Sequence, residues 1–132
     1  MPIVVEALNT PSYQDQQDLQ KIYQDAPQWL FAPFADERQL IEDSLSDGSL
    51  ITGRFNDRLL GAARLHRQAT VWQLSQLCVR KVTRRRGVAE RLVSEARSMA
   101  ERAGATLHLL APTGDPQARA LAAKLQLALK NL

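Results

Sequence analysis

The chain is poor in cysteine and aromatic residues and has no long hydrophobic run. Aromatic residues make up 5% of its 132 residues, and cysteine occurs once, as Cys78. A lone cysteine excludes an internal disulfide framework and is typical of a reducing compartment. The lack of an 18-residue apolar run excludes a transmembrane helix. Residues 1–6 contain no basic start leading into an apolar core, so we expect no signal peptide and a cytoplasmic location.

Several chemical motifs are missing as well. Neither His66 nor His108 lies at metal-ligand spacing from cysteine, aspartate or glutamate, so no metal site is predicted. The sequence has no Walker loop and no Gly-x-Gly-x-x-Gly fingerprint. No aromatic residues interleave with the basic ones, and no nucleic-acid-binding module is recognisable, which argues against a nucleic-acid partner.

What the chain does have is an uneven distribution of charge. Residues 1–48 contain nine acidic and two basic residues, a net charge of −7, whereas residues 49–132 carry +10. Five of the fifteen basic residues in the second part fall within residues 80–86. Such a concentration predicts a localised polyanionic partner.

Hydrophobic periodicity predicts a single domain, residues 1–132, with the element order β α α β β β α β α. Asn56-Asp57 predicts a tight hairpin turn. The strand before Gly87 and the strand after Gly104 are joined by a helix and should be parallel, which gives an α+β fold with a mixed central sheet and flanking helices. The aromatic cluster of Trp29, Phe31 and Phe34 is either core or a cover over a cleft. The expected strands are residues 3–8, 50–55, 59–65, 71–80 and 107–110, and the expected helices follow Ser12, Asp36, Gly87 and Asp115.

The stretch from Leu77 to Glu90 is the most informative part of the sequence. A strand ends there, a basic loop follows, and a helix begins at Gly87. A helix N-terminus exposes about four unpaired backbone N–H groups and a partial positive charge, which suit a phosphate. Gly87 and Ala89 allow the backbone to approach an anion closely. Three arginines, Arg84, Arg85 and Arg86, add positive charge, so the stretch predicts a diphosphate-binding loop.

The pattern Arg84-x-x-Gly87-x-Ala89, between a strand and an amphipathic helix, resembles the pyrophosphate loop of the GCN5-related N-acetyltransferase (GNAT) family. The order of elements is similar to that fold across residues 3–130. The resemblance implies a GNAT fold that binds acetyl-CoA or CoA. Pantetheine would pair with the strand backbone and pyrophosphate with the loop and helix start, so the implied cofactor-binding residues are Leu77, Cys78, Val79, Thr83, Arg84, Arg85, Arg86, Gly87, Val88, Ala89 and Glu90.

The sequence also departs from the family pattern. Active members often place a tyrosine on the last helix as general acid to the departing thiolate, and the corresponding position here is Ala122. We therefore expect no catalytic residue; if the site is active, His66, a carboxylate or a bound water is the candidate base. The family's terminal strand also has no counterpart, so we expect a C-terminally shortened fold. That shortening would leave an unprotected sheet edge near residues 106–110, which a partner or a second copy could cover.

Three segments, residues 18–22, 54–60 and 79–88, are similar to a regulatory branch of the GNAT family that uses acetyl-CoA to promote the self-cleavage of pro-aspartate decarboxylase. The resemblance implies this role in pantothenate and CoA biosynthesis, with the decarboxylase precursor as partner. Arg54 and Asn56 would then contact the precursor, or they simply stabilise the hairpin turn. Two other functions stay open: an active N-acetyltransferase whose acidic half attracts an amine, and a cofactor-binding remnant that serves as a dimerisation module.

Overall fold

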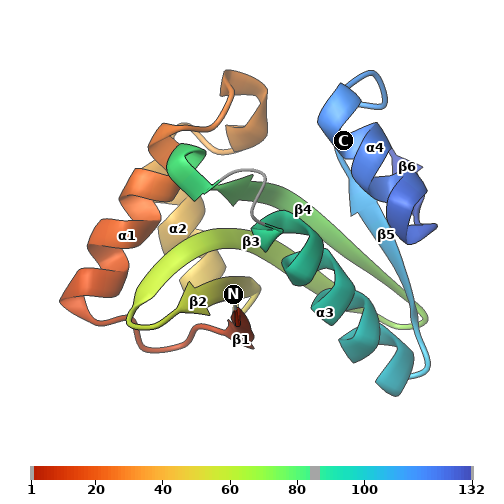
Figure 1. The fold of residues 1–132 in the computed structure, drawn as a ribbon, viewed down its shortest axis with the longest axis horizontal. Helices are drawn as coiled ribbons and strands as arrows, with labels where there is room; N and C mark the ends of the chain where they lie inside the picture. Colours follow the sequence, from red (N-terminus) through yellow and green to blue (C-terminus); the bar gives the residue numbers. More distant parts are fainter. Residues whose placement is uncertain (1, 84–86, 132) are drawn as a thin grey trace.

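The computed structural model describes residues 2–83 and 87–131 (Figure 1). This part of the chain forms a six-stranded sheet in the order β1-β2-β3-β4-β5-β6, with helices on both faces. In chain order the elements are β1 (Val4–Ala7), α1 (Tyr13–Gln24), the 3-10 helix η1 (Gln28–Phe31), α2 (Glu37–Ser46), β2 (Leu50–Phe55), β3 (Arg58–Gln68), β4 (Val71–Val79), the 3-10 helix η2 (Lys81–Thr83), α3 (Val88–Arg102), β5 (Thr106–Leu110), α4 (Pro116–Leu125) and β6 (Ala128–Lys130).

The sheet is mixed. Strands β1 to β4 form an antiparallel meander, whereas β5 runs parallel to β4 and β6 runs parallel to β5. The β4–β5 pair is parallel because α3 crosses over from the end of one strand to the start of the next. The predicted α+β fold with a mixed sheet is confirmed. Within residues 2–83 and 87–131, no helix is long and apolar enough to cross a membrane.

The sequence predicts an unpaired sheet edge near residues 106–110, and this prediction is wrong for residues 108–110. Strand β6 follows α4 and pairs with β5 at these three positions. The sequence hides this strand because α4 ends at Gln126, which adopts the left-handed conformation (φ 55°) that glycine or asparagine usually supplies. No glycine marks the end of the helix. The sequence pattern of β6, two apolar residues followed by a lysine, therefore resembles a continuation of the helix.

Two hydrophobic clusters hold the helices on the sheet. Helices α1 and α2 pack on one face through residues such as Leu19 and Leu40, which are fully buried. Helix α3 packs on the other face through Leu92 and Ala96, and Ala122 of α4 joins the same cluster. The caps that the sequence predicts form as expected, because the side chains of Ser12, Asp36 and Asp115 each accept a backbone N–H of the first helical turn.

A pair of glycines brings the start of α3 close to the sheet. Gly53 of β2 lies directly opposite Gly61 of β3. A Cβ atom on Gly61 would lie 2.9 Å from Leu92 Cδ1, 3.0 Å from Val88 Cγ1 and 3.2 Å from Val79 Cγ2. Side chains larger than hydrogen would therefore push the helix away. The end of β4 and the first turn of α3 consequently meet over Gly61.

Candidate cofactor and partner site

Strands β4 and β5 separate halfway along their length. Their pairing runs from Val71 opposite Thr106 to Leu74 opposite Leu109, and β4 then continues to Val79. In Figure 1 the two strands diverge toward η1 and the start of α4. Among the described residues no strand pairs with the β5-facing edge of residues 75–79. Backbone N–H and C=O groups on such an edge are available to an extended ligand.

The divergence coincides with a fixed irregularity in β4. Gln76 has a φ of 49°, and the register between β3 and β4 shifts nearby. The Tyr23 hydroxyl donates a hydrogen bond to the Gln76 carbonyl at 3.0 Å, and Gln76 Nε2 donates one to the Ala32 carbonyl at 3.0 Å. The Ser75 hydroxyl also donates to Gln76 Oε1. These bonds tie the irregular strand to α1 and to the segment after η1.

The predicted cofactor-binding residues lie on three consecutive elements. Leu77, Cys78 and Val79 end β4, Thr83 ends η2, and residues 87–90 begin α3. Gly87 is the N-cap of α3 with φ 81°, so the helix starts from a backbone conformation that suits glycine. Three further predicted residues, Arg84, Arg85 and Arg86, lie outside the described residues.

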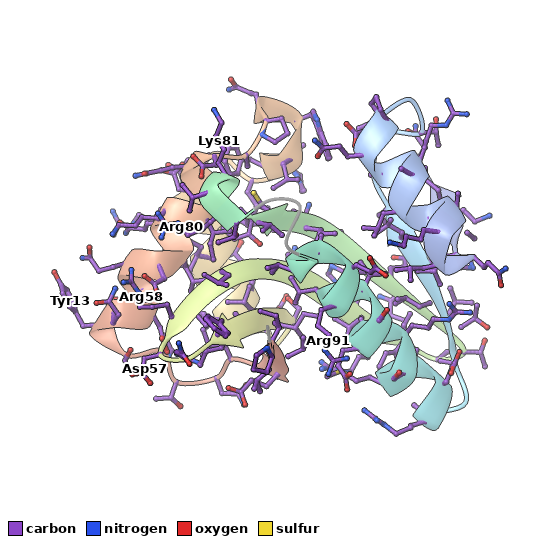
Figure 2. All side chains as sticks on the ribbon, in the orientation of Figure 1. Tyr13, Asp57, Arg58, Arg80, Lys81 and Arg91 are labelled. Atoms are coloured by element: carbon purple, nitrogen blue, oxygen red, sulfur yellow. The ribbon has the colours of Figure 1, made fainter. Side chains whose placement is uncertain are left out.

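Side-chain directions at the end of β4 alternate. Val79 packs in the α3 cluster, whereas the buried Cys78 packs in the α1 cluster with its Sγ 3.2 Å from the Ile22 carbonyl. Any contact of Cys78 with a ligand at the open edge would therefore use its backbone. Figure 2 shows Arg80 and Lys81 at the end of β4 on the side of α1, where the Lys81 N–H donates to the Asp25 carboxylate at 3.0 Å.

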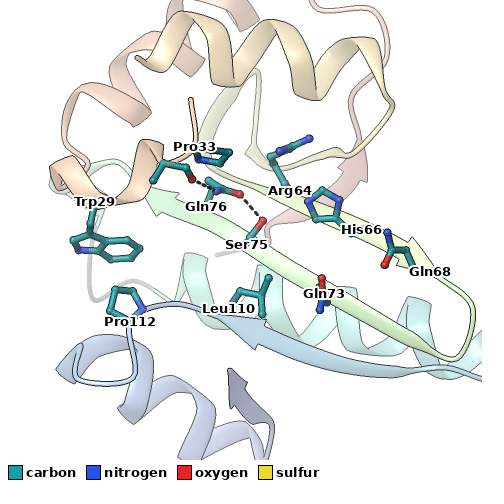
Figure 3. Close-up of a pocket in the computed structure, with 11 residues that line it drawn as sticks. Trp29, Pro33, Arg64, His66, Gln68, Gln73, Ser75, Gln76, Leu110 and Pro112 are labelled. Atoms are coloured by element: carbon teal, nitrogen blue, oxygen red, sulfur yellow. Dashed lines mark hydrogen bonds between the residues drawn. The ribbon is translucent and has the colours of Figure 1, made fainter. Parts of the chain in front are cut away.

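A cavity of about 690 Å³ opens beside this split (Figure 3). Trp29 and Pro33 form one wall, and Leu110 and Pro112 at the end of β5 form another. All three aromatic residues of the predicted cluster, Trp29, Phe31 and Phe34, pack against the α1 and α2 core, and Trp29 lines the cavity as well. The remaining lining residues are Ala32, Arg64, His66, Gln68, Gln73, Ser75 and Gln76.

Sequence reasoning singled out His66 but missed the polar neighbours of this cavity. The available signal was alternation: Arg64, His66 and Gln68 occupy every second position of β3, where a core strand would carry apolar residues. Burial lowers the pKa of His66, and the nearby Arg64 guanidinium lowers it further, so His66 is neutral near pH 7. Ala122 is buried on α4 and does not line the cavity.

The two residues predicted for partner contact lie at the β2–β3 hairpin. Arg54 Nη1 and Nη2 each donate to one oxygen of Asp15 at 3.0 Å. Arg58, on the other arm, binds Asp18 with its Nη2 at 2.7 Å from Oδ1. Asn56 lies in the turn with φ 55° and is exposed. The hairpin is thus fastened to α1 by an ion pair from each arm, and Arg54 has a structural role whatever else it contacts.

The two carboxylates on α1 are perturbed by these contacts. The hydrogen bonds from Arg54 hold the pKa of Asp15 below its ordinary value. Burial by itself would raise the pKa of Asp18, but the Arg58 guanidinium and the Leu59 N–H outweigh it and lower that pKa. Both side chains therefore stay ionised across the neutral range. In the described part of the chain, no group of three or more His, Cys, Asp or Glu residues is arranged to hold a metal ion.

The fold has counterparts among solved acetyltransferase structures. An acetyltransferase from Bacillus subtilis, solved in complex with CoA, superimposes with a TM-score of 0.69 over 95% of this chain and 76% of that one, at 15% identity. The fold is therefore that of the GNAT class. More specifically, the family described as "Acetyltransferase (GNAT) domain, PanZ" matches residues 2–126, and the chain belongs to that family.

Two relatives carry the name PanD regulatory factor. The protein from Salmonella typhimurium is 38% identical over 96 residues, and the protein from Escherichia coli K12 is 35% identical over 95 residues. Each alignment covers 72% of this chain and 66% of the relative. The match therefore spans slightly less than two thirds of each relative's length.

Proposed function

We propose that the chain binds acetyl-CoA or CoA and, in that form, promotes the maturation of the aspartate decarboxylase precursor. The proposal that the chain binds the cofactor is supported by the divergence of β4 from β5 directly before the start of α3. An extended pantetheine arm would pair with the backbone of residues 77–79. The pyrophosphate would then reach the N–H groups of the first turn of α3, where the helix dipole favours an anion.

The proposal that the protein promotes maturation of the precursor is supported by family membership and by the residues that line the cavity. The two named relatives are PanD regulatory factors. Among the described residues, the eleven that line the cavity include no tyrosine and no carboxylate. Tyr23 lies deep in the core with its hydroxyl donated to a backbone carbonyl, and burial raises its pKa, so it is a poor proton donor to a thiolate. These features favour cofactor binding without acyl transfer.

The partner surface in this proposal is the tip of the β2–β3 hairpin. Asn56 is exposed there and has its side chain available to a docking protein. Arg54, already bound to Asp15, would contribute mainly by holding the tip in place. In this proposal Asn56 contacts the precursor, and Arg54 holds the hairpin tip that carries Asn56.

The proposal is tested by mixing the protein with purified decarboxylase precursor and following self-cleavage on a gel, with and without acetyl-CoA. We expect the precursor to cleave itself faster only when this protein and acetyl-CoA are both present. Gly87→Glu places a carboxylate where the pyrophosphate would lie and should abolish the effect. Gly104→Glu is a matched control, because Gly104 also has a positive φ (75°) and open space around it but lies at the other end of α3. No acceleration by the unaltered protein would refute the regulatory role.

A second candidate function is acetyl transfer to an amine, and one observation favours it. His66 is neutral near pH 7 and lines the cavity, so it could accept the proton that an amine releases when it attacks the thioester. Free-thiol release from acetyl-CoA across a panel of amines tests this candidate. Turnover that disappears in His66→Ala would support it, and a flat response would eliminate it.

A further inference from the structure

The cavity beside the β4–β5 split has an unusual wall for the middle of a sheet. Arg64 lies opposite Ser75, and His66 lies opposite Gln73, on neighbouring strands. Together with Gln68 and Gln76, these side chains give one cavity six polar groups from the sheet alone. Figure 3 shows them along β3 and β4, with Trp29 and Pro112 at the other end of the cavity.

Two charged side chains belong to this cavity and its surroundings: Arg64, which lines it, and Asp47, which binds Arg64. Of the eleven lining residues that the structure describes, none is acidic, and Arg64 alone carries a formal charge. Arg64 is bound to Asp47, with Nη2 2.7 Å from Oδ2, but the two partners differ in exposure. The side chain of Arg64 is 10% exposed and that of Asp47 is 48% exposed. Arg64 Nε also donates to Ser49 Oγ at 3.1 Å. Arg64 lines the cavity and Asp47 is not among the described lining residues, so the positive member of the ion pair lies nearer to a bound ligand.

Some polar side chains of the cavity already form hydrogen bonds within the protein, whereas others do not. Ser75 and Gln76 bind each other, and Gln76 also binds Ala32. Within the described residues, the structure records no hydrogen bond from the side chains of His66 and Gln73. An imidazole and a carboxamide therefore offer N–H donors to whatever occupies the space. Each also carries an acceptor, so the charge at the cavity decides between an anionic and a cationic ligand.

We propose that this cavity binds a small molecule through a carboxylate group and discriminates against an ammonium group of the same size. N–H donors from Gln73 and His66 suit carboxylate oxygens, and the Arg64 charge attracts them. An ammonium group would find no carboxylate among the lining residues and would meet the same positive charge. Trp29, Pro33 and Leu110 provide an apolar surface for the rest of the ligand.

The experiment compares three four-carbon probes by titration calorimetry: succinate, succinamide and 1,4-diaminobutane. We expect succinate to bind at least about tenfold more tightly than the diamine, with succinamide between them. Fluorescence of Trp29, measured in a Trp72→Phe background, should change on titration with succinate because Trp29 lines the cavity. Equal or tighter binding of the diamine, or no saturable binding of succinate, would overturn the proposal.

Two variants locate the binding. Gln73→Glu adds a carboxylate to the cavity with little change in shape and should weaken succinate binding by about tenfold or more. Gln68→Glu, at an exposed lining position, should act in the same direction if Gln73→Glu folds poorly. Gln117→Glu, exposed on α4, is the matched control and should bind succinate normally. Unchanged affinity in both cavity variants would place the carboxylate elsewhere and refute the assignment.

These measurements use neither acetyl-CoA nor the decarboxylase precursor. The carboxylate site can therefore fail while the proposed regulatory function stands, and the reverse is equally true.

Discussion

The close approach of α3 to the sheet at Gly61 makes a quantitative prediction for Gly61→Ala. The new Cβ would lie 2.9 Å from Leu92 Cδ1 and 3.0 Å from Val88 Cγ1, whereas ordinary contacts begin near 3.4 Å. Both neighbours are essentially fully buried, so neither can rotate into free space. The helix start must move by a few tenths of an ångström. Overpacking of this kind costs about 1 to 3 kcal/mol.

One effect works in the opposite direction. Replacing glycine within a strand reduces the entropy of the unfolded chain and stabilises the fold by about 0.5 to 1 kcal/mol. The net destabilisation for Gly61→Ala is then about 0 to 2.5 kcal/mol, with a midpoint of about 1 kcal/mol, which is roughly 4 °C in Tm for a domain of this size. Because the first turn of α3 moves, acetyl-CoA should also raise the Tm of this variant less than that of the unaltered protein.

The matched control is Gly53→Ala on the opposing strand. Its Cβ would meet Ile3 Cγ2 at 3.2 Å but Leu92 and Val88 only at 3.5 and 3.6 Å. We therefore expect a smaller loss of stability and an undiminished response to acetyl-CoA. Chemical denaturation and thermal unfolding with and without ligand measure both quantities. If Gly61→Ala is as stable as Gly53→Ala, the argument that glycine sets the helix position is wrong.

Two further predictions concern acid stability and the last helix. The pKa values of Asp15 and Asp18 are lowered by folding, so their contribution to stability is present above the unfolded-state pKa and is lost as pH falls through the folded-state values. Asp15→Asn should flatten the loss of stability below about pH 5, measured by urea denaturation, whereas the exposed Asp43→Asn should not. Gln126→Gly should stabilise the protein by about 0.5 to 1 kcal/mol, because it removes a side chain from a left-handed position; a lower urea midpoint would contradict this.

Local signals in the sequence were sufficient for much of the fold. Ser12, Asp36 and Asp115 each precede a run with helical periodicity, and a side-chain oxygen followed by such a run is typical of the start of a helix. The hairpin at Asn56 was equally predictable because asparagine tolerates positive φ. The parallel crossover followed from the helix that joins its two strands. All of these features depend on residues close together in the chain.

The features that sequence reasoning missed depend on distant residues or on conformations the local sequence disfavours. Gln76 and Gln126 both occupy left-handed backbone positions that no glycine marks. The conformation of Gln76 is held by Tyr23 and Ala32, more than forty positions earlier in the chain. The cavity joins Trp29 to Pro112, and only the folded sheet brings them together. The phosphate-binding loop was predicted from a sequence motif. The role of its three arginines in binding phosphate stays a prediction.

The two ion pairs between α1 and the β2–β3 hairpin have a consequence for recognition. Asp15 and Asp18 lie one helical turn apart and hold opposite arms of the same hairpin, through Arg54 and Arg58. A loop tip that is braced on both sides has little conformational freedom to lose when a protein docks on it. Variants that release one arm should therefore slow or weaken docking by increasing the entropy cost of association, even though the residue at the tip, Asn56, is unchanged.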